Sequence, residues 1–310
     1  MIPSPVHRFS HQAMGSFFEV TIAGDEGSYA GQAAQAAFNE IDRLERLFSR
    51  FDPTSEISRI GRLRPGESLL IGVETFECLS VAERVRAETN GAFDINVRSA
   101  MKYGGSELNS QTHTEFQEEI RYVSANSFEL ATTGQGFEVR LGERAGGPWR
   151  PMDLDLGAIG KGYALDKALA VLADWSIVNA LIHGGTSTAV AVGNAPEKQG
   201  WPVGVGGGWP CQEAPREILL TGRALSGSGT EVKGQHIVDP RTGTPARGHA
   251  AAWALHPAAA SADALSTAFM VMDTAEVEDY CRRHSDVWAL VVKDYGDCRV
   301  FGEIKEKEHV

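Results

Sequence analysis

Apolar side chains recur with the 3.6-residue period of an α-helix along much of the chain. The clearest case ends at Phe48, where apolar residues share one helical face and Ser28 is placed to cap the start of the helix. The same spacing predicts further helices over residues 73–88, 160–173, 261–272 and 275–284.

Alternating apolar and polar residues, which are typical of β-strands, separate these helices. The clearest example is a hairpin over 128–141, with its turn at Gly134 and Gly136. Residues 224–230 (ALSGSGT) predict a flexible turn, and residues 98–120 predict mostly loop with a helical piece. Further strands are predicted at 16–22, 177–183, 188–193, 217–222, the start of 236–246, 250–255, 287–293 and 298–301. Because strands and helices mix without regular βαβ alternation, we expect an α+β fold with mixed or antiparallel sheets, in a single domain over 1–310.

Composition narrows the function classes. The 310 residues include 41 acidic and 29 basic side chains, a net charge of −12. Nonspecific nucleic-acid binding needs a basic face, so we expect no nucleic-acid partner. No run of about 18 apolar residues exists, so we expect no membrane span.

The cysteines and the N-terminus indicate a compartment. None of the four cysteines lies in a CxxC pair, so we expect reduced, mostly structural thiols. The N-terminal residues lack the apolar core of a signal peptide, and no lipoprotein leader is visible. We therefore expect a cytoplasmic location for the sequence as given.

The stretch 152–166 (MDLDLGAIGKGYALD) combines an alternating entry, three glycines and one lysine before a helical pattern. A glycine-rich turn at a helix N-terminus can bind a phosphate group, and Lys161 favours negative charge there. A plain strand-to-helix turn with a solvated lysine explains the same pattern. The Walker A motif does not fit, because Gly162 follows the lysine where that motif has Ser or Thr.

Asp263 and Thr267 are four residues apart, which places them on one face of a helix. A carboxylate and a hydroxyl are hard oxygen ligands that suit Mg²⁺. The alternative is that Asp263 caps the helix and Thr267 is packed.

Histidine supplies the candidate general base. His236 enters a strand beside a polar turn, and its imidazole titrates in the range that proton transfer needs. His183 is a weaker candidate of the same kind. The chain has nine histidines, and most such residues are structural or solvated.

In combination and in order, these motifs resemble the FAD:protein FMN transferase (ApbE-like) family. The resemblance rests on MGS (14–16), SRFDPTSEISRI (49–60), GAFDINV (91–97), DLGAIGKGYALD (155–166), LSGSG (225–229), HIVDPRTGTP (236–245) and ADALSTAF (262–269).

The resemblance implies two interlocked lobes around a flavin cleft. It implies Mg²⁺-dependent transfer of FMN from FAD to a Ser or Thr hydroxyl of an acceptor protein, with release of AMP. The acceptor would be a flavoprotein subunit, as a rule a redox protein and often membrane-bound. His236 matches the catalytic histidine, and the metal ligands would be Asp263, Thr267, Ser266 and the Ala158 carbonyl. The residues that match the FAD-contacting positions are Met14, Phe51, Ala92, Phe93, Asp94, Asp155, Lys161 and Ile237.

The chain departs from the family pattern at several places. GAFD continues as INVRSAMKYGG, and HGGTST (183–188) lacks the usual acid. Two alternatives stay open beside transfer. The same site could serve hydrolysis of FAD to FMN and AMP, and the altered HGGTST segment leaves open FAD binding without catalysis.

Overall fold

The computed structural model describes residues 5–99, 128–142, 151–209, 211, 213–230, 237–294 and 296–304. Within them the helices are α1 (Gly27–Phe48), α2 (Glu56–Ile60), α3 (Val73–Glu88), α6 (Gly160–Asp174), α7 (Ala259–Val271) and α8 (Thr274–Arg283). The strands of the largest sheet are β1 (Val6–Ala13), β2 (Ser16–Ala23), β6 (Ala180–Gly184), β7 (Thr188–Val192), β10 (Arg223–Gly229), β13 (His249–His256), β14 (Trp288–Lys293) and β15 (Cys298–Phe301).

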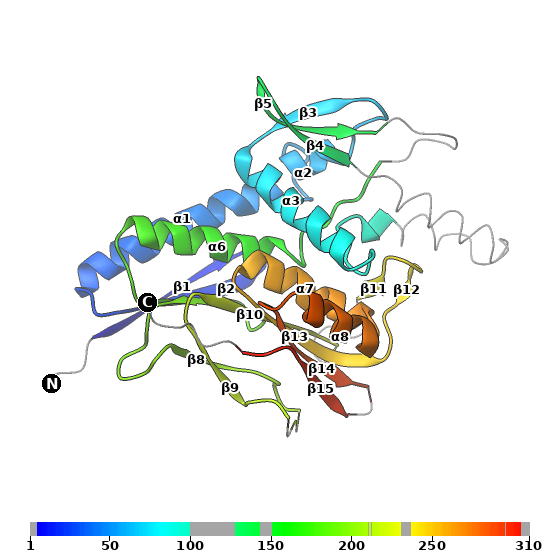
Figure 1. The fold of residues 1–310 in the computed structure, drawn as a ribbon. Coiled ribbons are helices and arrows are strands. Elements are labelled where there is room, and N and C mark those ends of the chain that lie inside the picture. Colours follow the sequence, from blue (N-terminus) through cyan, green and yellow to red (C-terminus); the bar gives the residue numbers. More distant parts are fainter. Residues whose placement is uncertain are drawn as a thin grey trace.

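This 8-stranded sheet has the order β1-β2-β6-β7-β10-β13-β14-β15, and every neighbouring pair is antiparallel. Helices α1, α6 and α7 pack against one face of it (Figure 1). The hairpin of β8 (Trp201–Gly204) and β9 (Glu217–Leu220) covers part of the other face. The sheet therefore has an apolar layer on both sides, and the helices lie on only one of them.

A smaller lobe lies at one end of the helical layer (Figure 1). It joins α2 and α3 to an antiparallel sheet of β3 (Ser68–Ile71), β5 (Gly136–Leu141) and β4 (Phe128–Thr133). The rings of Phe76 and Phe137 pack at 4.7 Å between helix and sheet. The stretch ahead of α6 runs along this lobe, since the Met152 N–H donates to the Gly61 carbonyl at 2.8 Å.

Most predicted elements are confirmed, including the hairpin over 128–141 and the helices over 73–88, 160–173, 261–272 and 275–284, to within two residues. A short two-stranded unit of β11 (Val238–Asp239) and β12 (Thr244–Pro245) matches the strand and turn predicted at 236–246. Residue 236 itself lies outside the described residues.

Two local predictions are wrong. Residues 224–230 are not a flexible turn, because 223–229 form β10 between β7 and β13. Ser28 does not cap α1: Glu26 is the N-cap residue, and the Ser28 hydroxyl donates to the Glu26 carboxylate at 2.7 Å.

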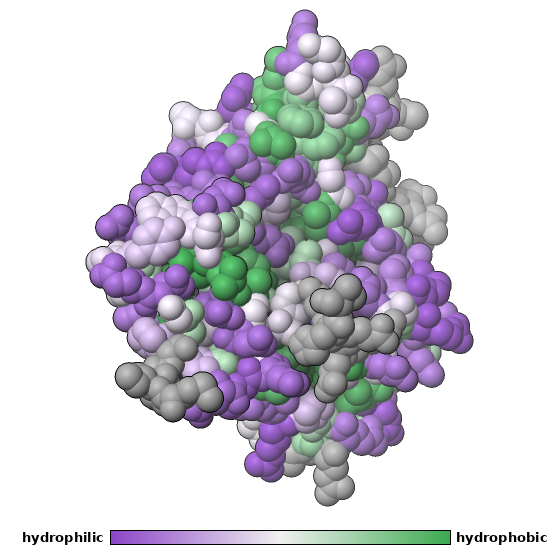
Figure 2. Space-filling model, turned by 60° about the vertical axis from the view of Figure 1, so that its left-hand side comes forward, coloured by the Kyte–Doolittle hydropathy of each residue, from purple (hydrophilic) through white to green (hydrophobic). Residues whose placement is uncertain are grey.

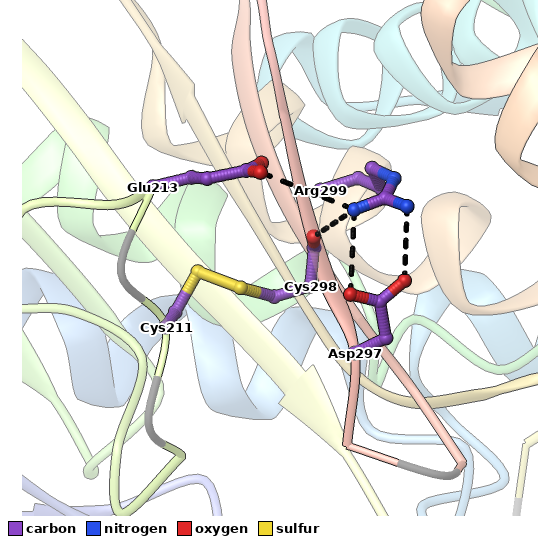
Figure 3. Close-up of a disulfide and its surroundings, with 5 residues drawn as sticks. All are labelled: Cys211, Glu213, Asp297, Cys298 and Arg299. Carbon is purple, nitrogen blue, oxygen red and sulfur yellow. Dashed lines mark hydrogen bonds and ion pairs between the residues drawn. A yellow bond between two sulfur atoms is a disulfide. The ribbon is translucent and has the colours of Figure 1, made fainter.

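The expectation that all thiols are reduced is also wrong. Cys211 and Cys298 form a disulfide, which ties the segment after β8 to the edge strand β15 (Figure 3). Cys78 and Cys281 are free and buried, as structural thiols are expected to be. Disulfides persist mainly in oxidising compartments, so the cytoplasmic location stays a prediction that the state of these cysteines can test.

The outer surface is mostly hydrophilic, with hydrophobic residues gathered near the centre and the top of the face in Figure 2. Two large aromatic side chains are unusually open to solvent, Phe17 at 69% and Phe51 at 80% exposed. Among the described residues, no helix is both long and apolar enough to cross a bilayer.

Candidate functional site

The site is built where the start of α6 meets the second turn of α7. Gly162 makes this meeting possible, because a Cβ there would lie 2.2 Å from the Ala259 carbonyl oxygen and 2.8 Å from the Asp263 Cβ. The two backbones therefore approach more closely than a side chain at residue 162 would allow. Asp166, one turn further along α6, accepts hydrogen bonds from the N–H groups of Ala259 and Ala260 at 2.8 and 2.9 Å. Asp166 thus caps α7, and Asp263 is not the capping residue.

Asp263 is 3% exposed and is surrounded by hydrogen-bond donors. The Lys161 ammonium lies 3.2 and 3.3 Å from its two carboxylate oxygens. The Gly162 N–H donates to Oδ2 at 3.1 Å. The hydroxyls of Thr188 and Ser226 each reach Oδ1 at 3.3 Å. This arrangement holds a buried carboxylate in one orientation and offsets its charge with Lys161.

A chain of hydroxyl groups continues from Asp263 along α7 and β10. Thr188 and Ser226 are 2.9 Å apart, and Ser266 lies 3.4 Å from Ser226. Ser228 then contacts Ser266 at 2.9 Å and Thr267 at 3.2 Å. Asp263, Ser266 and Thr267, three predicted metal ligands, are therefore connected through one polar network.

Ala158, the fourth predicted ligand, lies in the turn that precedes α6. Its backbone is three residues before Lys161, and its side chain packs against the main core. The approach of its carbonyl to Asp263 stays a prediction.

Asp155 begins the same turn. Its Oδ1 accepts the Gly157 N–H at 2.8 Å, and its Oδ2 lies 3.6 Å from Arg50 Nε and 3.8 Å from an Arg98 terminal nitrogen. The Asp155 N–H donates to the Ile95 carbonyl at 2.8 Å, which joins the turn to the segment after α3.

The other predicted flavin contacts fall into two groups. Phe51 is open to solvent, and Met14 occupies a left-handed backbone conformation (φ 51°) in the turn between β1 and β2. The remaining residues are buried or half-buried: Ala92, Phe93, Asp94 and Ile237. Phe93 at 3% exposed is a core residue as the side chain stands, so its expected role in stacking a ring stays a prediction.

Burial perturbs several titratable groups around the site. It raises the pKa of Asp94 to about 6, against the lowering effects of the Asn96 N–H and of Arg86. It raises the pKa of Asp166 to about 6 as well, although two backbone N–H groups bond the carboxylate. Burial, and then the charge of Asp263, raise the pKa of the Cys78 thiol well above its usual range. Cys78 is therefore a packed, unreactive thiol beside the site.

The structure describes only one of the two histidines predicted as candidates for the general base. His183 lies on β6 opposite Glu19, and burial lowers the pKa of its imidazole. His236 lies outside the described residues, and its catalytic role stays a prediction.

The types of donor atom around Asp263 determine which metal ion could bind there. No group of three His, Cys, Asp or Glu side chains among the described residues is arranged to bind an ion. One buried carboxylate with neighbouring hydroxyls suits Mg²⁺, which takes one or two carboxylates and completes its shell with water and substrate phosphates. The residues around Asp263 thus fit a Mg²⁺–phosphate ligand better than a metal held by protein alone.

Sequence reasoning missed the supporting residues Asp166, Thr188, Ser226 and Ser228. Two signals were available: the hydroxyls of LSGSG on β10, and the absent acid in HGGTST, where Thr188 supplies a hydroxyl to Asp263 instead.

Comparisons with known proteins show which family the chain belongs to. The model of the ApbE family matches residues 14–291. FAD:protein FMN transferase of Salmonella typhimurium is 23% identical over 299 residues, covering 91% of this chain and 83% of that protein. The protein of the same name from Escherichia coli K12 is 22% identical over 303 residues, with the same coverage.

Solved structures show the same fold. The apo form of flavinyl transferase ApbE from Pseudomonas stutzeri superposes with a TM-score of 0.77 at 20% identity, covering 97% of both chains. The ApbE protein of Thermotoga maritima gives a TM-score of 0.75 at 24% identity, covering 96% of this chain and 97% of that one. These matches confirm the α+β architecture with antiparallel sheets, and the family match covers most of the chain: this protein belongs to the ApbE family.

Proposed function

We propose that this protein transfers FMN from FAD to a Ser or Thr hydroxyl of an acceptor protein, releasing AMP in a Mg²⁺-dependent reaction. The names of its relatives support flavin transfer. The main support for the Mg²⁺-dependent mechanism is the buried Asp263 carboxylate, which Lys161 and Gly162 hold in place. A network of hydroxyl groups leads from this carboxylate toward Thr267.

Each residue has a distinct task in this proposal. Asp263, Thr267 and the Ala158 carbonyl are the Mg²⁺ ligands, and Ser266 supports them. Bound Mg²⁺ would neutralise the charge of the FAD pyrophosphate. Lys161 holds Asp263 in place and adds a positive charge beside the reacting phosphate. His236 accepts the proton of the acceptor hydroxyl.

The reaction balances without an oxidant or reductant. The acceptor oxygen forms a bond to the FMN phosphorus while the bond from that phosphorus to the oxygen of AMP breaks. AMP leaves with that electron pair, and the proton of the hydroxyl passes to His236. The acceptor is defined only as a protein that carries a reactive Ser or Thr.

The test is incubation of the protein with FAD, Mg²⁺ and candidate flavoprotein subunits from the same cell. We expect one acceptor to gain the mass of one FMN and to keep flavin fluorescence after denaturation. Asp263→Asn should abolish this labelling and keep the fold, because it removes the charged ligand with little change in size. Labelling by Asp263→Asn at the wild-type rate would contradict the proposal.

A further inference from the structure

Two arginines, Arg50 and Arg98, converge on Asp155 in the turn before α6. Arg50 Nε lies 3.6 Å from Asp155 Oδ2, and an Arg98 terminal nitrogen lies 3.8 Å from the same oxygen. Arg98 Nε lies 3.6 Å from Asp153 Oδ2. All four side chains are partly exposed, between 29% and 38%.

Among the described residues, no hydrogen bond joins either arginine to Asp153 or Asp155. The ion-pair distances are longer than a charge-assisted hydrogen bond of about 2.7–2.9 Å. The Nε of Arg98 is buried and has no hydrogen-bond partner among the described residues. A guanidinium has five N–H donors, so the two arginines keep donors for another acceptor. Within the part of the chain that the structure describes, the ion pairs with Asp153 and Asp155 therefore leave part of each planar guanidinium without an acceptor.

The surroundings indicate what that acceptor is. The guanidinium of Arg50 lies 4.2 Å from the ring centre of Phe51, which is 80% exposed. An exposed aromatic ring against one guanidinium, with a second guanidinium near the same Asp155 carboxylate, suits a ligand with a flat ring and a phosphate, since Arg recognises phosphate by paired N–H bonds. Asp155 is three residues from Ala158 and six from Lys161, so the cluster lies at the start of the turn that leads into α6.

We propose that Arg50 and Arg98 bind a phosphate group of the flavin dinucleotide and make the site selective for phosphorylated ligands. On binding, their fork donors turn from Asp155 toward the phosphate, and Asp155 is freed to accept hydroxyl groups of the ligand. This proposal rests on the proposed function, because it takes FAD to be the ligand. Arg98 lies in the stretch after GAFD where this chain departs from the family pattern.

The test measures equilibrium binding of FAD, FMN, AMP, riboflavin and adenosine to the wild type, Arg50→Gln and Arg98→Gln. We expect each variant to weaken FAD binding by about tenfold or more, as for loss of a charge-assisted hydrogen bond. Binding of the uncharged ligands should change by less than about twofold, and the salt dependence of FAD binding should fall. Weakening of AMP or of FMN shows which half of the dinucleotide the arginines contact.

Controls separate binding from folding. Arg282→Gln on α8, where the side chain is 76% exposed, should leave every affinity unchanged. Arg98→Lys keeps the positive charge but lacks the planar guanidinium. Its affinity for FAD should lie between those of the wild type and Arg98→Gln, and its melting temperature should equal that of Arg98→Gln. Unchanged FAD affinity in both glutamine variants, or equal losses for FAD and riboflavin, would overturn the proposal.

Different experimental results would refute the transfer reaction and the role of the two arginines. A protein that binds FAD through these arginines but labels no acceptor would refute only the transfer reaction. A protein that labels its acceptor equally well with either arginine removed, at FAD concentrations below saturation, would refute only the role of the arginines.

Discussion

The close approach of α6 and α7 at Gly162 leads to the sharpest structural prediction. An added Cβ at this position would lie 2.2 Å from the Ala259 carbonyl oxygen and 2.6 Å from the carbonyl carbon. Ordinary contact begins at 3.4 Å, so the backbones would have to separate by about 1.2 Å, the difference between these distances. Neither contacting atom is at the end of a flexible side chain, so the strain cannot be relieved by a rotamer change.

The expected cost of Gly162→Ala follows from two opposing effects. Alanine favours a helical backbone by about 0.5–1 kcal/mol over glycine. Overpacking of a rigid contact costs about 1–3 kcal/mol or more. We therefore expect the free energy of unfolding to fall by about 1–2 kcal/mol, or roughly 2–3 °C in melting temperature.

In Gly162→Ala, the rate of acceptor labelling should fall more strongly than the stability of the fold. A separation of about 1 Å breaks the 3.1 Å bond from the Gly162 N–H to Asp263 and moves Lys161 away from the carboxylate. Misplacement by 1 Å can cost about 100-fold in rate. We expect a loss of this size in the rate of acceptor labelling.

Gly160→Ala is the matched control, two residues away in the same turn. There the added Cβ would lie 3.5 Å from Leu156 Cβ and 3.9 Å from Phe48 Cδ2, which are ordinary contacts. Thermal unfolding and labelling rates are measured for both variants. Equal melting temperatures and equal rates for Gly160→Ala and Gly162→Ala would refute the argument from close approach.

Two further predictions concern stability. Reduction of the disulfide, or Cys298→Ser, should lower the free energy of unfolding by about 4–5 kcal/mol, because the bond closes a loop with a sequence separation of 87 residues; thiol titration of the denatured protein should detect only Cys78 and Cys281, and four titrating thiols would contradict the bond. Asp166→Asn should change how stability depends on pH. The native pKa of Asp166 is raised to about 6 from a usual value of 3.8, so this group makes the wild type less stable as pH rises from 4 to 6. Urea unfolding at both pH values should show that the variant lacks this loss, and parallel profiles would contradict it.

Most of the fold could be predicted because its elements have strong local patterns. The helix ending at Phe48 and the hairpin over 128–141 carry the periodicities of their structures. β10 was missed because its sequence of small residues has no strand propensity. It is a strand through its pairing with β7 and β13: a Cβ at Gly227 would lie 2.5 Å from Trp253 Nε1 on β13, so only glycine fits there unless Trp253 moves.

The candidate site could be predicted only in part. Asp263, Thr267 and Lys161 stand in recognisable motifs, and the structure brings Lys161 to Asp263 across 102 residues of chain. The only local signal for Thr188 is the missing acid in HGGTST, and the role of Asp166 has none, because both roles depend on which strands and helices become neighbours. The disulfide likewise joins cysteines that no sequence spacing connects.

In the proposed reaction, FAD is split at its pyrophosphate with a protein hydroxyl as the acceptor. The most direct measurement follows AMP release and FMN incorporation together, in one reaction with FAD, Mg²⁺ and the acceptor. We predict one AMP for each FMN attached, no release when the acceptor hydroxyl is removed by Ser→Ala or Thr→Val substitution, and neither product from Asp263→Asn. AMP formed at the same rate without acceptor would show that water is the acceptor, and FMN attached without Mg²⁺ would show that Asp263 does not act through a metal.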